Sequence, residues 1–168
     1  MKSLELHDRL IKAQDLQQKV DSYMKVWKEN HIETALCEEF HEWYNALGLF
    51  KDWKKNKTVK EKQLDELADC LAFALSLLNH KHKTFSYDRC KFTLKRINNK
   101  EHKSAMLNEI KTGYLFNKQV GNTVYIQEPE NAIELIIDIA ILFYTLEELF
   151  EAYEKKSLVN IQRQKDGY

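Results

Sequence analysis

The sequence contains few of the residues that reverse a chain. Only four Gly and one Pro occur among its 168 residues. A β-sandwich or β-barrel usually needs more of both to turn its strands, so the composition argues against an all-β fold. Hydrophobic residues make up 43% and charged residues 31% of the chain, which fits a globular protein rich in helix formers. We therefore predict an all-α fold, and the length favours a single domain.

The sequence also lacks a net charge, a long apolar run and a cysteine motif. Lys plus Arg and Asp plus Glu both number 26, so nothing indicates a protein that binds nucleic acid through general electrostatics. No apolar run approaches the roughly 18 residues of a membrane span, and the N-terminus has no apolar signal core. Cys37, Cys70 and Cys90 form no CxxC pair, so neither a zinc site nor a disulfide framework is predicted. We expect a reduced, soluble, cytoplasmic protein.

Apolar residues recur every three or four positions in six stretches, which is typical of helices. Gly48 would end the second helix, Thr58 would cap the third, and Pro129 suits the first turn of the last. The segment Leu158–Tyr168 is polar and is expected to be less fixed. The expected helices cover residues 10–28, 32–47, 59–78, 87–97, 103–110 and 130–155.

The stretch from about residue 81 to residue 128 is the least regular part of the chain. It is rich in Lys, His and Asn. Gly121-Asn122 lies between β-prone runs, so a short hairpin is an option there, although Gly-Asn is a weaker turn signal than Asn-Gly. No repeat or clear linker divides the chain, and we predict one domain over residues 1–168.

Two pairs of carboxylates lie at i and i+3 in predicted helices. Glu39 and Glu42 form the first pair, and Glu66 and Asp69 form the second. On a helix such residues share one face. Four crowded carboxylates would repel and raise one another's pKa values, whereas divalent cations would make the arrangement favourable. The spacing alone also arises by chance in a chain with 26 acidic residues, so solvated helix faces are the alternative.

Five segments along the chain form a recognisable series of motifs. They are Gln17-Gln-Lys-Val20-Asp21, Glu39-Phe-His-Glu42-Trp-Tyr-Asn45, Phe50-Lys51-Asp52-Trp53, Glu66-Leu-Ala-Asp69-Cys-Leu-Ala-Phe73 and Tyr153-Glu-Lys-Lys156-Ser-Leu-Val-Asn160-Ile-Gln-Arg163-Gln-Lys-Asp-Gly167-Tyr168. In this order they resemble the dimeric all-α dUTPase family. The ExxE and ExxD pairs alone would indicate only the wider MazG-like pyrophosphohydrolase superfamily, and the FKxW element and the C-terminal motif are more specific.

The resemblance implies a helical bundle of the all-α NTP pyrophosphohydrolase type. Its expected reaction is Mg²⁺-dependent hydrolysis of dUTP, and of dUDP, to dUMP with release of pyrophosphate or phosphate. The resemblance implies that Glu39, Glu42, Glu66 and Asp69 bind the metal, and that Glu39 activates the attacking water. The remaining residues that it assigns to substrate binding are Gln17, Asn45, Trp53 and Phe73 for the nucleoside, and Lys156, Asn160 and Arg163 for the phosphates.

The chain departs from the family pattern in ways that leave alternatives open. Ala72 stands where the family usually has His, so another dNTP such as dCTP is an alternative substrate. Ser157 replaces the usual Asn of the C-terminal motif. Residues 81–128 have no firm counterpart and resemble a variable insertion. Small relatives are common in bacteriophages and some bind repressor proteins, so this insertion is a candidate surface for a repressor. The resemblance also implies a homodimer, for which the apolar stretches Leu71–Leu78 and Ile133–Leu149 would supply surface.

Overall fold

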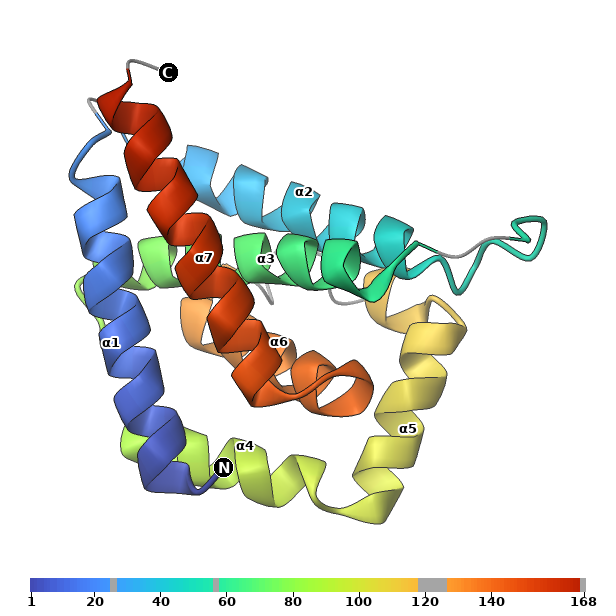
Figure 1. Cartoon of the computed structure of the whole chain (residues 1–168). Helices are drawn as coiled ribbons and strands as arrows, with labels where there is room; N and C mark the ends of the chain where they lie inside the picture. Colours follow the sequence, from blue (N-terminus) through green and yellow to red (C-terminus); the bar gives the residue numbers. More distant parts are fainter. Residues whose placement is uncertain (25–26, 56–57, 118–126, 167–168) are drawn as a thin grey trace.

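The computed structural model describes residues 1–24, 27–55, 58–117 and 127–166. These residues form seven helices and contain no strand, which confirms the predicted all-α class (Figure 1). No helix in the described ranges has both the length and the apolar character needed to cross a membrane. The helices are α1 (Ser3–Asp21), α2 (Glu29–Leu47), α3 (Lys60–His80), α4 (Tyr87–Ile97), α5 (Lys100–Lys111), α6 (Pro129–Phe143) and α7 (Leu146–Lys165).

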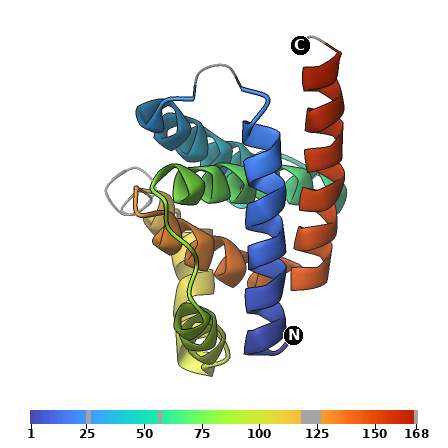
Figure 2. The same cartoon turned by 90° about the vertical axis from the view of Figure 1, so that its left-hand side faces the viewer.

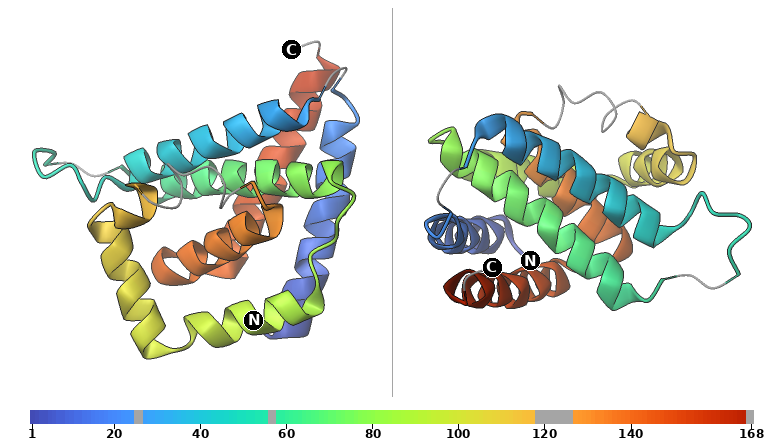
Figure 3. Two further views of the ribbon diagram at one scale, coloured as in Figure 1. Left: turned by 180° about the vertical axis from the view of Figure 1, so that it is seen from behind. Right: turned by 90° about the horizontal axis from the view of Figure 1, so that it is seen from above.

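Helix α3 lies at the centre of the fold and contacts α1, α2, α6 and α7. Helix α2 runs alongside α3, and α1 stands beside α7 (Figures 2 and 3). Leu67, Leu71 and Leu75 of α3 are fully buried on successive turns, which explains its central place. Residues 133–140 of α6 are buried as well. The predicted dimer surface at Leu71–Leu78 and in the first half of Ile133–Leu149 was therefore wrong for most of these side chains, because they fill the core of the chain, whereas Ala72 and Phe73 are partly exposed.

The predicted helix over residues 130–155 is two helices that meet at Tyr144. The backbone of Tyr144 is extended (φ −139°, ψ −156°). Thr145 then caps α7, since its hydroxyl accepts from the Glu148 backbone N–H and the Glu148 carboxylate accepts from the Thr145 N–H. This reciprocal pair is a capping box, and it starts a new helix where the apolar periodicity alone continues the old one.

Other helix boundaries also differ from the prediction. Helix α1 ends at Asp21, whereas the predicted helix extended to residue 28. Val59, and not Thr58, precedes α3, and the Thr58 carbonyl accepts a hydrogen bond from the Gln63 side chain (2.9 Å). The C-terminal segment is helical to Lys165, so the expectation of a less fixed tail was wrong. The predicted hairpin falls mainly on residues 118–126, which lie outside the described residues.

Gly48 ends α2 as predicted. Its φ of +65° is in the left-handed region, which a residue without a Cβ adopts at little cost. Its backbone N–H donates to the Tyr44 carbonyl (3.0 Å). The turn directs the chain into the loop that joins α2 to α3, and so sets the two helices side by side.

Two arginines of α4 attach the described part of residues 81–128 to α6. The Arg96 guanidinium donates to the carboxylates of Glu134 (2.7 Å) and Asp138 (2.6 Å), and that of Arg89 donates to Glu134 (2.8 Å). The Glu134 and Asp138 side chains are buried. These ion pairs and the buried side chains of α5 hold the described part of the insertion in place.

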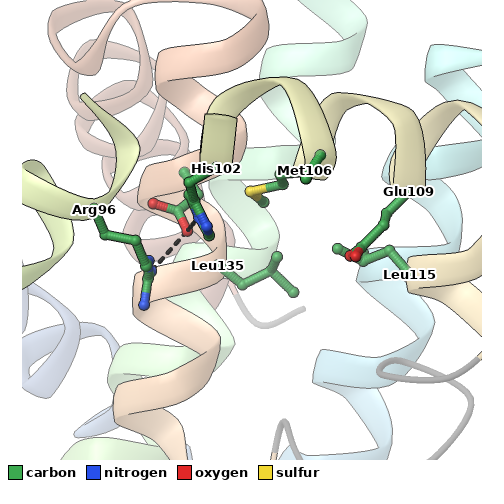
Figure 4. Close-up of a pocket in the computed structure, with 8 residues that line it drawn as sticks. Arg96, His102, Met106, Glu109, Leu115 and Leu135 are labelled. Atoms are coloured by element: carbon green, nitrogen blue, oxygen red, sulfur yellow. Dashed lines mark hydrogen bonds and ion pairs between the residues drawn. The ribbon is translucent and has the colours of Figure 1, made fainter. Parts of the chain in front are cut away.

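A pocket of about 130 Å³ lies beside these ion pairs, between α4, α5 and α6 (Figure 4). Arg96, His102, Met106 and Leu135 are among the residues that line it. Within the described part of the chain, Arg96 Nε, His102 Nε2 and Asp138 Oδ1 are buried and make no hydrogen bond. A polar pocket of this size is large enough for ordered water.

Candidate active site

Three of the four predicted carboxylates meet between α2 and α3. Glu39 and Glu42 lie on α2 and Glu66 on α3, and one ligand oxygen from each lies within 4.8 Å of the other two. Asp69, one turn farther along α3, forms a close ion pair with Lys156 of α7. The i, i+3 spacing puts each pair on one face of its helix, and the packing of α2 against α3 brings these faces together.

The environment of the cluster makes its negative charge costly. Burial raises the pKa of Glu39 to about 7, the charges of Asp69, Glu42 and Glu66 add to the rise, and Lys156 opposes it. Burial also raises the pKa of Asp69, against the hydrogen bond from Lys156. Near neutral pH, the cluster therefore gains from taking up a proton or a cation.

The donor set fits a hard divalent cation. Carboxylate oxygens are the ligands that Mg²⁺ prefers, and it normally keeps water or phosphate in the rest of its shell. Glu39 and Glu66 are half-buried and Glu42 is exposed, so the cluster opens to solvent on one side. No nitrogen or sulfur ligand belongs to the group among the described residues, which argues against a zinc-type site.

Two pockets with basic side chains flank the carboxylate cluster. One has a volume of about 170 Å³ and lies along α7, where it includes Lys156, Asn160 and Arg163. The structure thus brings together the three residues predicted for the phosphates. The other has a volume of about 330 Å³ and lies at the α2–α3 loop, where Glu42 and Glu66 share it with Asn45, Lys51, Lys54 and Lys62.

Gln17 lies at the opposite end of the cluster from this loop. Gln17 is only 5% exposed, and both the nitrogen and the oxygen of its side-chain amide have hydrogen-bonding partners. The Gln17 Nε2 donates to Asp21 Oδ1 (2.8 Å), and the Tyr153 hydroxyl lies 3.1 Å from Gln17 Oε1. The same hydroxyl donates to the Ala13 carbonyl (2.8 Å). These contacts tie α1 to α7.

The polar contacts of Gln17 continue to α3 and to the segment before α2. Ser76 donates to Asp21 Oδ2 (2.8 Å) and accepts from the Trp27 indole N–H (2.6 Å). The Trp27 ring packs on Phe73 with 6.0 Å between ring centroids. Glu66, Phe73 and Ser76 share one face of α3, so the aromatic pair and the carboxylates form one continuous strip.

The structure does not bring Asn45 and Trp53 to Gln17 within one chain. About 20 Å of helix rise separates Lys62, which shares a pocket with Asn45, from Ser76. Trp53 lies in the α2–α3 loop, at the end of the molecule away from α1, and its side chain is 75% exposed (Figure 1). Its ring makes an edge contact with Phe50.

Sequence reasoning missed several residues of this region. Trp27 and Ser76 carried no signal, because they meet across 49 residues of chain. Tyr153 and Asp21 belong to the segments that resemble the family, but the sequence indicated no role for either residue. Lys62 had the signal of an i, i+4 pair with Glu66, and its ammonium lies 3.3 Å from that carboxylate.

Comparison with models of protein families gives one result that covers nearly all of the chain. The model described as dUTPase, of the all-α type, matches residues 4–168. A search of curated proteins gave no match. The family match confirms the family expected from the five sequence segments.

Proposed function

The chain belongs to the all-α dUTPase family, and on this premise we propose that Mg²⁺ bound at its carboxylate cluster supports hydrolysis of dUTP to dUMP and pyrophosphate. The observation that carries the proposal is the close approach of Glu39, Glu42 and Glu66, with a pKa near 7 at Glu39. We propose dUDP as a second substrate, which would be hydrolysed to dUMP and phosphate at the same cluster.

Glu39 is the residue best suited to act as general base. Its pKa is about 7 without a cation, and cations bound beside it would lower that pKa and keep the carboxylate ionised, as a base requires. In the proposed step it accepts a proton from water while the water oxygen bonds to the α-phosphorus. The bond between that phosphorus and the bridging oxygen breaks, and pyrophosphate leaves with the electron pair. Metal ions held by Glu39, Glu42, Glu66 and Asp69 would lower the pKa of the water and offset the charge of the phosphates.

The α7 pocket is suited to the phosphates. Lys156 already contacts the carboxylate of Asp69, so its ammonium stands where a triphosphate would meet the metal cluster. Arg163 lines the same pocket, and a guanidinium can contact phosphate oxygens with two N–H groups. We propose that Lys156, Asn160 and Arg163 bind the phosphates.

We propose that the nucleobase lies at the Gln17 end of the strip. Phe73 and Trp27 provide aromatic surface there, and Gln17 provides an amide donor and acceptor. Asn45 and Trp53 were predicted for the same pocket, but within one chain they lie at the lysine-rich end. Gln17 and Phe73 are therefore our candidates for contacts with the base.

A panel of nucleotides tests the proposed function. We expect the chain to release pyrophosphate from dUTP in the presence of Mg²⁺, to release phosphate from dUDP, and to lose both activities when a chelator is added. The panel also contains dCTP, dTTP, dATP and dGTP, each tested separately as a substrate. Preferred turnover of dCTP would support the alternative left open by Ala72, and no turnover of any dNTP would contradict the proposal.

We propose that the chain forms a homodimer. Half of the large apolar side chains that remain exposed in the described residues lie on α1, α4 and α7: Leu4, Tyr87, Phe92, Leu158 and Val159. They offer apolar surface to a second copy, since most apolar side chains of α3 and α6 are buried. Sedimentation equilibrium should give a mass of twice the 20.0 kDa of the chain, and a mass of 20.0 kDa at micromolar concentration would contradict the proposal.

Three finer predictions belong to the same proposal. A reduced, cytoplasmic location is supported by Cys70 and Cys90, whose buried thiols form no disulfide. A phage origin and a repressor bound through residues 81–128 stay predictions. The described part of that segment includes α4 and α5, which pack on α6 through Arg96. Replacing exposed side chains of α4, as in Lys91→Glu with Lys95→Glu, should therefore weaken binding of such a partner without loss of the carboxylate cluster.

A further inference from the structure

A glutamine side chain can recognise either uracil or cytosine. Its carboxamide presents one acceptor and one donor group. Uracil offers the N3–H donor beside the O4 acceptor, and cytosine offers the N3 acceptor beside the N4–H donor. A half-turn of the carboxamide exchanges its two groups, so the same side chain matches the other base. Gln17 can select one pyrimidine only if the orientation of its carboxamide is fixed.

Asp21 fixes this orientation. Its ionised carboxylate only accepts hydrogen bonds, and Gln17 Nε2 donates to Oδ1 at 2.8 Å. The reversed carboxamide would place Gln17 Oε1 against Oδ1, acceptor against acceptor, in a site where Gln17 is 5% exposed. Such a buried mismatch is costly, because neither oxygen can turn to water.

Tyr153 cannot fix the orientation by itself. Its hydroxyl donates to the Ala13 carbonyl at 2.8 Å and lies 3.1 Å from Gln17 Oε1. A hydroxyl both donates and accepts, so its oxygen would also accept from the N–H of a reversed Gln17 carboxamide. The contact that distinguishes the two orientations is therefore the one with Asp21.

The Asp21 carboxylate is itself held in place. Ser76 donates to Oδ2 at 2.8 Å, and the hydroxyl of Ser76 accepts from the Trp27 indole N–H at 2.6 Å. Both oxygens of Asp21 therefore accept a hydrogen bond from a neutral donor, although burial raises the pKa of this carboxyl. The two donors also prevent the carboxyl group from rotating freely.

We propose that Asp21 is a positioning residue that determines pyrimidine specificity. By holding the Gln17 carboxamide in one orientation, it leaves one N–H and one lone pair of Oε1, which can pair with only one of the two pyrimidines in a given pose of the base. The family substrate, dUTP, assigns this arrangement to uracil. The inference rests on the proposed function, in which Gln17 contacts the base.

Asp21→Asn tests the inference. An Asn carboxamide can turn either its oxygen or its nitrogen toward Gln17, so both orientations of Gln17 become allowed. We expect the ratio of kcat/KM for dUTP to kcat/KM for dCTP to fall about 10- to 100-fold, mainly because dCTP is used better. The kcat for dUTP should change far less than this ratio. In Tyr153→Phe, the ratio should stay near that of the wild type.

The controls separate this inference from the proposed function. If the wild type uses no dNTP, the proposed function fails. If Gln17→Ala leaves the ratio unchanged, Gln17 does not contact the base. If Gln17→Ala changes the ratio and Asp21→Asn does not, the role of Asp21 is overturned.

A second variant covers the case in which Asp21→Asn shows no cooperative thermal unfolding. Ser76→Ala keeps the carboxylate but removes the hydrogen bond to Oδ2, which frees Asp21 to turn away from Gln17. The dUTP to dCTP ratio should then fall several-fold, on the order of one lost hydrogen bond. An unchanged ratio in folded Ser76→Ala would overturn the proposal.

Discussion

Replacing Glu39 by Gln should lower kcat for dUTP by about 10²- to 10⁴-fold, the range typical for the loss of a general base. Glutamine keeps the shape of the side chain but cannot accept a proton or supply an anionic metal ligand. Glu39 is half-buried and has a pKa near 7, and it shares the cluster with Glu42 and Glu66. The measurement is the initial rate of pyrophosphate release at saturating dUTP and Mg²⁺.

Glu38→Gln is the matched control, because Glu38 is the adjacent residue on α2 and is exposed. It should change kcat by less than about twofold, since a solvated carboxylate contributes little. Thermal unfolding without added metal separates lost chemistry from lost structure. Glu39→Gln should be at least as stable as the wild type, because it relieves repulsion within the cluster. A Glu39→Gln protein that keeps a tenth or more of the wild-type kcat would exclude Glu39 as the base.

Replacing Arg96 by Met should destabilise the fold by about 3–5 kcal/mol, the cost of leaving one member of a buried ion pair alone. Asp138 Oδ2 accepts from Arg96, and its Oδ1 makes no hydrogen bond in the described part of the chain. The Asp138 side chain is 5% exposed, and His102 lies 3.9 Å away without a hydrogen bond. The measurement is the free energy of unfolding in urea at pH 8.

Two companion variants make this test specific. Adding Asp138→Leu to Arg96→Met removes the buried charge and should recover most of the lost stability. Glu154→Gln breaks the exposed pair with Arg9 (3.7 Å) and should cost less than about 1 kcal/mol. A loss below about 1 kcal/mol in Arg96→Met would show that Asp138 does not depend on this pair.

The pH dependence gives an independent check on the same pair. Burial raises the pKa of Asp138 to about 6 even beside Arg96, and removal of Arg96 raises it further. The folded pKa then lies above the unfolded one, so stability falls as the pH rises between these two values. The loss caused by Arg96→Met should therefore be larger at pH 8 than at pH 5.

Local sequence signals predicted most helices and missed one boundary that was also encoded locally. The Gly48 stop and the bounds of α4 follow from residues close to them in the chain. The break before α7 was missed because the apolar periodicity continues across the Thr145–Glu148 capping signal. The last turns of α7 were missed because Ser157, buried beside Ile161, has the appearance of a surface residue.

The candidate site was predictable where it depends on one helix and unpredictable where it depends on several. Spacing at i and i+3 predicted that the acidic pairs share faces, and α2 and α3 bring Glu39, Glu42 and Glu66 together. The hydrogen bond between Trp27 and Ser76 joins segments whose proximity depends on packing. The distance between Gln17 and Trp53 within one chain likewise follows from the arrangement of helices, which no motif contains.

Helix α7 joins the two halves of the site through residues one turn apart. Tyr153 contacts Gln17, and Lys156 contacts Asp69. A ligand that displaces Lys156 from Asp69 changes the free energy of packing α7 against the rest of the chain. The contact between Tyr153 and Gln17 belongs to the same packing, so it is affected as well. Linkage then makes the effect reciprocal: the factor by which a cation at Asp69 changes the affinity for the nucleotide equals the factor by which the nucleotide changes the affinity for the cation.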